Sequence, residues 1–355
     1  MSVLSAKGLE LAAKTVMSGI QPTGLLHVGN LLGAVNSWVN FSRTAPQSTT
    51  IVYMIADLHA LTVYKPSSNL CDNRWKALAS ILACGIDPHR CDLYFQSHIP
   101  AHSELHWVLS SVSSMGYLSR MVQWKSKANI GEDASLESLT GSEMSNLNLA
   151  LFSYPTLQAS DVLLHNADYV PVGDDQSQHI ELTRHLAQVF NHRYGKLFKS
   201  PSTVLTPFKK ILSLRDPSKK MSKSDADANA SILLTDDTDT IIGKIRRAVT
   251  DSVQGPITYD PINRPGVSNL VLIGAGAENC EPEQYLSKHV IRTHAELKQV
   301  VANSVETYIS PIREHYNRIL DDRAHLQSIA NLGKDKVMAR SDKMMDRVRA
   351  HTGLS

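Results

Sequence analysis

The sequence is poor in cysteine, and its few cysteines are not spaced for a disulfide framework or a metal site. Cys71, Cys84, Cys91 and Cys280 include no Cys-x-x-Cys pair. This usage is typical of a reducing compartment rather than of a disulfide-rich secreted protein. A chain of 355 residues can bury a large core, so neither disulfides nor a metal ion are needed to hold the fold.

Long apolar runs and a strong charge imbalance are also absent from the sequence. No run reaches the roughly 18 apolar residues of a membrane helix, so we expect no membrane contact. Hydrophobic residues make up 42% of the chain, which is typical of a soluble globular protein. The net charge of +2 at pH 7 neither requires nor excludes a polyanionic partner, because a basic patch can form on a nearly neutral surface.

Strand and helix patterns alternate through the first half of the chain, and helical patterns dominate the second half. Strands are indicated at 15–20, 49–57, 91–97 and 169–173, with helical periodicity between them. This alternation predicts an α/β fold with a Rossmann-like, doubly wound parallel sheet. From about Ser231 the pattern predicts a C-terminal helical domain, and the length agrees with two domains.

Two segments do not fit this alternation. Residues 129–148 are polar and acidic, which predicts a mobile loop. The first fifteen residues combine Lys7 and Lys14 with leucines and a single acid, Glu10. Transit peptides share these features, and so does an ordinary first helix. Residues 1–15 are therefore interpreted either as a targeting segment or as an N-terminal extension.

The stretch 22–30, "PTGLLHVGN", lies between the first strand and the first helix. In doubly wound sheets, ligands bind beyond the carboxyl ends of the strands, where helix N-termini offer N–H groups to phosphate. Glycine lets the backbone approach such a ligand closely. The stretch is either a phosphate cradle that contains His27 or a turn whose histidine has no special role.

A basic stretch, "KKMSKS" at 219–224, lies far along the chain. Lysines separated by small hydroxyl residues cannot build a core. The stretch is therefore either a solvated surface loop or a lid that closes ammonium groups over a triphosphate. Preorganised cations in such a lid would stabilise the charge that develops on a leaving pyrophosphate.

Together and in this order, the two stretches resemble the signatures of class I aminoacyl-tRNA synthetases. His27-Val28-Gly29-Asn30 corresponds to the HIGH motif of that family, and residues 220–224 match its KMSKS motif letter for letter. The stretches "SGIQPTG", "YPTLQASDVLL", "VPVGDDQSQHIELTR" and "RDPSKKMSKSD" narrow the resemblance to tryptophanyl-tRNA synthetases, mitochondrial type. The resemblance runs from about Val16 to the C-terminus.

The resemblance implies how the chain is divided. A Rossmann catalytic domain would cover 16–225, with an insertion at about 100–165 for dimerisation and tryptophan binding. A helical anticodon-recognition domain would cover 226–355, with its last helix packing back on the catalytic domain. The loop 129–148 is longer than the family pattern, so its role stays open.

The resemblance also implies a tryptophan pocket. Asp161 matches the family's acceptor for the indole N–H, and a buried acceptor rejects analogues that lack this donor; the alternative is a solvent-facing helix carboxylate. His59 is either a pocket residue or a satisfied histidine at a strand end. The residues implied to bind tryptophan are Met17, Ser18, Gly19, Gln21, His59, Tyr154, Gln158, Asp161 and Gln176.

The implied nucleotide site joins the two signature stretches. Its residues are Gln21, Pro22, Thr23, His27, Gly29, Asn30, Gly173, Asp174, Asp175, Ile211, Lys220, Met221, Ser222, Lys223 and Ser224. Of these, we expect His27, Asn30, Lys220 and Lys223 to carry the catalysis. Lys125 and Lys127 either contact the phosphates or form an exposed basic helix face.

Two positions depart from the family pattern. Gln158 stands where family members often have methionine, so a pocket for an indole must supply this amide with a partner. The sequence has "GDDQ" where the family pattern has the commoner "GEDQ", so the side chain of Asp174 is one methylene shorter than the usual glutamate.

The resemblance implies a two-step reaction in which L-tryptophan is activated by ATP and transferred to tRNA(Trp). Mg²⁺ would accompany ATP, bound by phosphates rather than by a metal site of the protein. A homodimer in the mitochondrial matrix is implied, with a cytoplasmic location as the alternative. Tyrosine activation, a small nucleotidyltransferase, and a catalytically silent RNA-binding protein are the competing interpretations.

Overall fold

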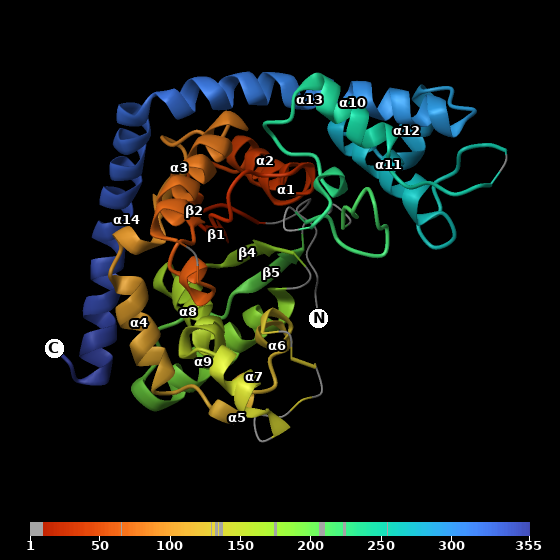
Figure 1. Cartoon of the computed structure of the whole chain (residues 1–355). Coiled ribbons are helices and arrows are strands. Elements are labelled where there is room, and N and C mark those ends of the chain that lie inside the picture. Colours follow the sequence, from red (N-terminus) through yellow and green to blue (C-terminus); the bar gives the residue numbers. More distant parts are fainter. Residues whose placement is uncertain are drawn as a thin grey trace.

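A five-stranded parallel sheet forms the centre of the N-terminal part of the chain (Figure 1). The computed structural model describes residues 10–64, 66–128, 130–131, 134, 138–173, 176–205, 210–222, 225–253 and 255–355. The strands are β1 (Thr15–Ile20), β2 (Thr50–Ile55), β3 (Asp92–Phe95), β4 (Tyr169–Val172) and β5 (Ser202–Leu205), in the order β3-β2-β1-β4-β5. The order changes direction at β1, and such a switch point opens a crevice at the carboxyl ends of the strands.

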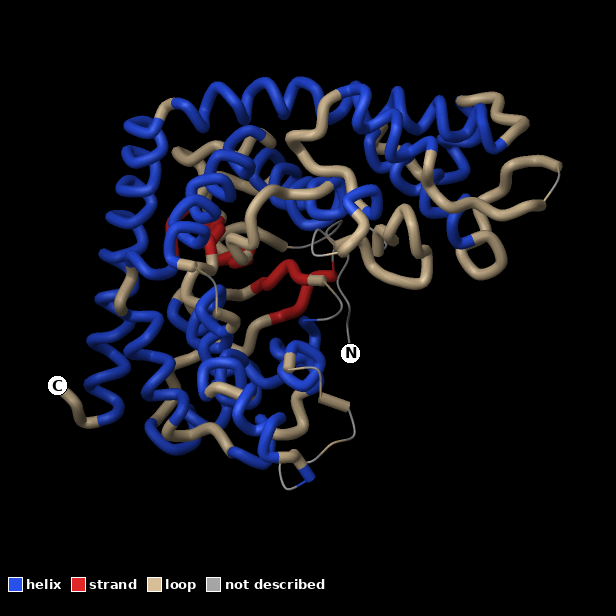
Figure 2. Tube along the Cα trace, in the orientation of Figure 1, coloured by secondary structure: helices blue, strands red, loops and turns tan. Residues whose placement is uncertain are grey.

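Helices cover both faces of the sheet (Figure 2). In β2, Ile51, Tyr53 and Ile55 pack into one hydrophobic cluster, while Val52 and Met54 pack into another. Because side chains alternate along a strand, each face of the sheet has its own core. The first core includes α2 (Asn36–Thr44) and α3 (Ser67–Ala83), and the second includes α4 (Ala101–Ser110), α8 (Leu149–Leu164) and α9 (Ser177–Tyr194). The predicted doubly wound sheet is confirmed.

The rest of the chain is helical, as the sequence predicts. It contains η6 (Ala228–Ala230), α10 (Thr238–Arg246), α11 (Pro265–Ala277), α12 (Pro282–Lys288), α13 (His294–Asp321) and α14 (Arg323–Thr352). Figure 1 shows α10 to α12 beside the sheet-containing part, with α13 extending back across it. No helix among the described residues is both long and apolar enough to cross a membrane.

The C-terminal helix α14 lies along the β3 edge of the sheet (Figure 1). Gly333 faces β3 so closely that a Cβ atom there would lie 1.8 Å from the carbonyl oxygen of Leu93. Arg340 pairs with Asp92 at the start of β3, and the Arg349 guanidinium donates to Glu104 of α4 at 2.8 Å. These contacts connect the end of the chain to its first half.

Shorter elements surround the crevice. They are α1 (Val28–Asn30), the π-helical turn η1 (Leu31–Val35), η2 (His59–Thr62), η3 (Gln96–His98), α5 (Met115–Leu118), α6 (Val122–Lys127) and α7 (Gly141–Asn146).

The structure corrects several predicted boundaries. The predicted loop 129–148 contains α7, where Thr140 caps the backbone N–H of Glu143. Helix α8 begins at Leu149, directly after the predicted loop, because the Asn148 side chain caps Leu151 N–H at 2.8 Å, and Pro155 is accommodated inside the helix. The strand β5 was not predicted.

Replacing Gly333 with alanine tests the contact between α14 and β3. The added methyl group must displace backbone, so we expect the free energy of unfolding to fall by about 3 kcal/mol. Urea unfolding measures the change. Gly141→Ala is the matched control, because a Cβ at Gly141 meets no atom within 4 Å, and its effect should stay within about 1 kcal/mol. Equal stability of the two variants would contradict the close packing of α14.

Candidate active site

A cavity of about 580 Å³ opens at the carboxyl ends of β1, β2 and β4. This volume is in the range of small-molecule sites. The strands contribute mainly apolar wall, and polar groups come from α6, α8 and the connecting loops. The lining residues are Met17, Ser18, Gly19, Ile20, Gln21, Met54, Ala56, His59, Gln123, Ser126, Lys127, Tyr154, Gln158, Asp161, Val162, Val170, Val172 and Gln176. The cavity thus brings together all nine residues that the sequence analysis grouped around tryptophan.

Local geometry explains why these residues meet. Gly19 is the penultimate residue of β1, where a Cβ atom would lie 3.2 Å from the carbonyl oxygen of Met54, so the absent side chain leaves room between the strands. Tyr154 and Asp161 are seven residues apart on α8, which places them on the same helix face. The helix continues through Pro155, so the two side chains reach one cavity.

Asp161 is a buried carboxylate with nitrogen contacts from three different elements. Oδ2 lies 2.7 Å from His59 Nε2, and Oδ1 accepts a hydrogen bond from Gln96 Nε2 at 2.7 Å. His102 Nδ1 also lies 2.7 Å from Oδ1. Only 1% of Asp161 is exposed, so it is not a solvent-facing helix carboxylate.

These contacts determine the charge of Asp161. Burial alone would raise its pKa, because a carboxylate loses its hydration. The hydrogen bonds from His102 and His59, with the attraction of their positive charge when protonated, outweigh burial and lower the pKa well below its usual range. Asp161 is therefore an ionised acceptor at neutral pH, and His59 is a hydrogen-bonded member of the cavity wall.

A second polar network along the cavity is centred on Tyr154. Tyr154 Oη donates to Gln123 Oε1 at 3.0 Å and lies 3.3 Å from His179 Nε2. His179 Nδ1 is 3.0 Å from Gln176 Oε1, which also accepts from Gln158 Nε2 at 3.2 Å. Gln158 thus has the partner that the sequence analysis required of it.

The histidine stretch forms the turn that leads into α1. His27 is the N-cap residue, and its backbone N–H donates to Asn30 Oδ1 at 3.2 Å. A Cβ atom at Gly29 would lie 3.0 Å from the His27 ring and 3.4 Å from Ile211 Cβ. The absence of a side chain at Gly29 therefore lets the imidazole and Ile211 approach the turn.

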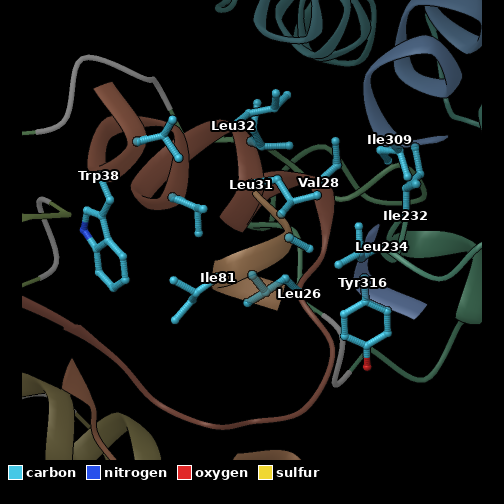
Figure 3. Packing of buried hydrophobic residues seen from close by; sticks show 14 of the residues in the cluster. Leu26, Val28, Leu31, Leu32, Trp38, Ile81, Ile232, Leu234, Ile309 and Tyr316 are labelled. Atoms are coloured by element: carbon cyan, nitrogen blue, oxygen red, sulfur yellow. The ribbon is translucent and has the colours of Figure 1, made fainter. Parts of the chain in front are cut away.

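Apolar packing holds this turn in place (Figure 3). Leu26, Val28, Leu31 and Leu32 point into a cluster that also contains Ile232 and Leu234 and, from α13, Ile309 and Tyr316. Two backbone hydrogen bonds also hold the turn: Val28 N–H donates to Ile232 O at 2.8 Å, and Leu234 N–H donates to Leu26 O at 2.9 Å. The turn is thus held by a segment that lies 204 positions away in the sequence, from Val28 to Ile232.

The KMSKS stretch begins in a loop that is anchored next to this turn. Met221 N–H donates to Ile211 O at 2.9 Å, and the buried side chains of both residues join the same cluster. Asn269 of α11 bonds both backbone groups of Leu212, at 2.8 and 2.9 Å. Lys220 and Ser222 are exposed beyond this anchor. Ile211 therefore brings the two signature stretches together.

The two lysines of α6 have different surroundings. Lys125 is buried and lies over the Trp124 ring at 5.8 Å, so it is not on an exposed basic face. Lys127 is exposed along the cavity, with Nζ 4.2 Å from the centre of the Tyr154 ring.

The remaining expected nucleotide residues are only partly described. Pro22 is buried, whereas Thr23 and Gly173 are exposed at strand ends. Asp174, Asp175, Lys223 and Ser224 lie outside the described residues. Among the residues that are described, no group of three or more His, Cys, Asp and Glu is arranged to hold a metal ion.

Sequence reasoning missed Gln96, His102, Gln123 and His179. Two signals could have found the first pair. Gln96 directly follows β3, at the sheet edge where ligands bind. His102 precedes Leu105 and Leu109 by three and seven residues, which puts a polar ring on the apolar face of α4.

Comparison with known proteins gives consistent results. The family model described as tRNA synthetases class I (W and Y) matches residues 11–310. Tryptophan–tRNA ligase, mitochondrial, of Saccharomyces cerevisiae is 43% identical over 333 residues, covering 93% of this chain and 88% of the yeast protein.

Two crystal structures are similar over nearly the whole chain. Tryptophanyl-tRNA synthetase from Mycoplasma pneumoniae has a TM-score of 0.84 and 30% identity, covering 96% of this chain and 98% of the other. Tryptophanyl-tRNA synthetase from Campylobacter jejuni complexed with ADP and tryptophan has a TM-score of 0.76 and 29% identity, covering 96% and 100%. The similarity includes both the sheet and the helical part.

Proposed function

Because the chain belongs to the class I tRNA synthetases of the tryptophan and tyrosine family, we propose that it attaches L-tryptophan to tRNA(Trp) by means of ATP. The observation that carries this proposal is the buried, ionised Asp161 at the wall of a largely apolar cavity. An indole has one N–H donor on an otherwise apolar ring, and Asp161 is the one carboxylate among the described residues that line this largely apolar cavity. The tryptophan-named relatives support the same substrate.

In this proposal tryptophan lies in the cavity with its indole N–H on Asp161. Tyr154 and Gln176 would lie near the amino group, and Met17, Ser18 and Gly19 along the ring. Their common position around one cavity supports this assignment. A substrate without the N–H donor would leave a buried carboxylate unpaired, which is a strong penalty.

ATP would bind at the histidine turn and the adjacent KMSKS loop. Asn30 Oδ1 is engaged by the turn itself, so its amide Nδ2 is the group we assign to phosphate. Gly173, Asp174 and Asp175 would contact the ribose, and Ile211 the adenine. The buried Ile211–Met221 contact supports this arrangement, because it places the loop next to Gly29.

The proposed reaction has two steps. The tryptophan carboxylate attacks the α-phosphorus of ATP, and pyrophosphate leaves with the electron pair of the broken P–O bond. A hydroxyl of the terminal tRNA ribose then attacks the carbonyl carbon of the tryptophanyl-adenylate and loses its proton to water, and AMP leaves with the electron pair of the broken acyl C–O bond. Neither step requires a side-chain nucleophile, so His27, Asn30, Lys220 and Lys223 would act by positioning and charge stabilisation. Mg²⁺ would enter with ATP, coordinated by its phosphates.

A homodimer is part of the proposal. Leu61, Val63, Tyr64 and Leu149 are exposed apolar side chains, with exposed fractions of 59, 48, 90 and 77%. Asn148 Nδ2 donates to Thr62 O at 3.0 Å and holds the two segments together. A contiguous apolar surface of this kind is typical of protein interfaces. We propose that a second copy of the chain binds this surface. The insertion 100–165 and η2 would together form the interface.

The helical domain at 226–355 is proposed to read the anticodon of the tRNA. We also propose the mitochondrial matrix as the location. The support for it is the mitochondrial name of the yeast relative.

Pyrophosphate exchange into ATP tests the substrate directly. With each amino acid supplied in turn, we expect exchange with tryptophan and roughly a thousandfold less with tyrosine, because the phenol places its single donor at a different position from the indole N–H and leaves the buried carboxylate unpaired. Exchange with tyrosine alone would identify a tyrosyl enzyme. Folded protein that exchanges with no amino acid would favour an RNA-binding protein without catalytic activity.

Lys223→Ala tests the lid role of the KMSKS loop. Adenylate formation should slow by about 100-fold, because a preorganised cation at the leaving pyrophosphate is lost, while the Kd for tryptophan changes less than about twofold. Single-turnover kinetics and calorimetry measure the two quantities. Lys219→Ala is the matched control, since Lys219 is exposed and paired with Asp216 at 2.9 Å; it should alter neither quantity. An equal loss of rate and affinity in Lys223→Ala would refute the lid role.

Leu149→Glu tests the dimer. A charge inside an apolar interface is strongly unfavourable, so sedimentation velocity should show a mass of one chain instead of two. Leu354→Glu is the control, because Leu354 is similarly exposed, at 67%, but follows α14 and does not belong to the exposed apolar group of η2 and α8. A Leu149→Glu protein that stays dimeric would place the interface elsewhere.

A further inference from the structure

The two oxygens of Asp161 have different surroundings. Oδ1 has two nitrogen contacts at 2.7 Å, from Gln96 Nε2 and His102 Nδ1. Within the described part of the chain, Oδ2 has one, from His59 Nε2 at 2.7 Å. A carboxylate oxygen has two lone pairs, so Oδ1 is saturated and Oδ2 retains one. Asp161 lines the cavity, where this lone pair can meet a ligand.

His102 is itself oriented by a buried hydrogen-bond chain. Its Nε2 lies 2.8 Å from Tyr94 Oη, which is 2.9 Å from His165 Nε2. Burial, followed by the charge of His102, lowers the pKa of His165 well below its usual range, and burial raises that of Tyr94. Both groups are therefore neutral at neutral pH.

This chain of hydrogen bonds constrains which atoms carry protons. His102 Nδ1 lies 2.7 Å from the Asp161 carboxylate, so we assign the proton of a neutral His102 to Nδ1, because an unprotonated nitrogen there would repel the oxygen. When His102 is neutral, Nε2 must accept, and Tyr94 donates to it while accepting from His165. His102 is wholly buried, as is Gln96, so water does not replace either contact.

We propose that His102 and Gln96 are positioning residues for substrate selection: by saturating Oδ1 of Asp161 they leave Oδ2 as the oxygen that accepts a donor N–H of the bound amino acid. This inference rests on the proposed function, because it takes tryptophan as the ligand of the cavity. His102 and Gln96 do not line the cavity, so both act through Asp161.

The proposal has a pH dependence whose sign follows from these contacts. A protonated Asp161 would present a hydroxyl toward the indole in place of a lone pair. With both donors present, the low pKa keeps tryptophan binding constant across neutral and mildly acidic pH. Without one donor, the pKa of Asp161 rises toward the value that burial favours, and binding is lost as pH falls through it.

Other titratable groups around Asp161 could also produce a pH effect. They are His59 from η2, His102 and His106 from α4, Tyr94 from β3, His165 after α8, and Tyr154 and Lys127 along the cavity. The experiment therefore compares variants that change only the donors on Oδ1.

The test measures KM and kcat in pyrophosphate exchange between pH 5.5 and 8.5. The substrates are L-tryptophan and β-(3-benzothienyl)-L-alanine, in which sulfur replaces the indole N–H. His102→Leu removes the donor, and His102→Asn retains an N–H near the position of Nδ1. Gln96→Met removes the second donor at nearly constant volume, so it serves if His102→Leu does not fold. Ser160→Ala is the matched control, because Ser160 is buried beside Asp161 but donates to the His102 backbone oxygen.

We expect the wild-type KM for tryptophan to be flat with pH and the benzothienyl analogue to be strongly rejected. In His102→Leu and Gln96→Met, the KM for tryptophan should rise tenfold or more toward acid, with kcat at high pH little changed. Rejection of the analogue should weaken by a similar factor. His102→Asn should restore the flat profile, and Ser160→Ala should keep it.

Two results would overturn the proposal. One is a flat profile with unchanged rejection of the analogue in folded His102→Leu and Gln96→Met. The other is an acid limb in Ser160→Ala as large as theirs, since loss of buried packing would then explain it. If the wild-type protein does not activate tryptophan, or Asp161→Asn accepts both substrates as the wild type does, the proposed function fails, whatever His102 does.

Discussion

A single buried carboxylate connects the parts of the crevice. Asp161 projects from α8 on one face of the sheet, and the contacts that hold its charge come from η2, η3 and α4. Unpaired, such a charge would cost several kcal/mol. Asp161 therefore links the positions of these elements to one another. The same negative charge that would accept an indole N–H also requires these surrounding contacts.

The nucleotide side of the crevice depends on apolar packing. The histidine turn is held by backbone hydrogen bonds to Ile232 and Leu234 and by the contact between Gly29 and Ile211. Asn269 of α11 fixes the start of the KMSKS loop. The helical part of the chain therefore supports the phosphate end of the site, in addition to any role in tRNA binding. Activation of tryptophan and recognition of tRNA would share these contacts.

The fold could be predicted from local signals in the sequence, and most of the cavity from the family resemblance of its motifs. Alternating apolar runs indicated four of the five strands, and the two signature stretches pointed to the switch point of the sheet. The missed strand, Ser202–Leu205, is short and lies at the edge of the sheet, where it pairs with β4. Helix α7 inside the predicted loop 129–148 was missed because that segment is polar and acidic, and only the cap by Thr140 marks its start.

By itself, the sequence determined the sheet and the order of the signature stretches, since periodicity and motif spacing are properties of the chain, and its resemblance to a known family implied the candidate pocket residues. Only the tertiary structure decided which oxygen of Asp161 is available, that Gln158 is paired with Gln176, and that Lys125 is buried. Those facts depend on side chains from distant segments meeting at 2.7 to 3.2 Å, and no spacing along the chain encodes such a distance. The physical reason is that charge and acceptor geometry in a buried site come from three-dimensional neighbours, not from sequence neighbours.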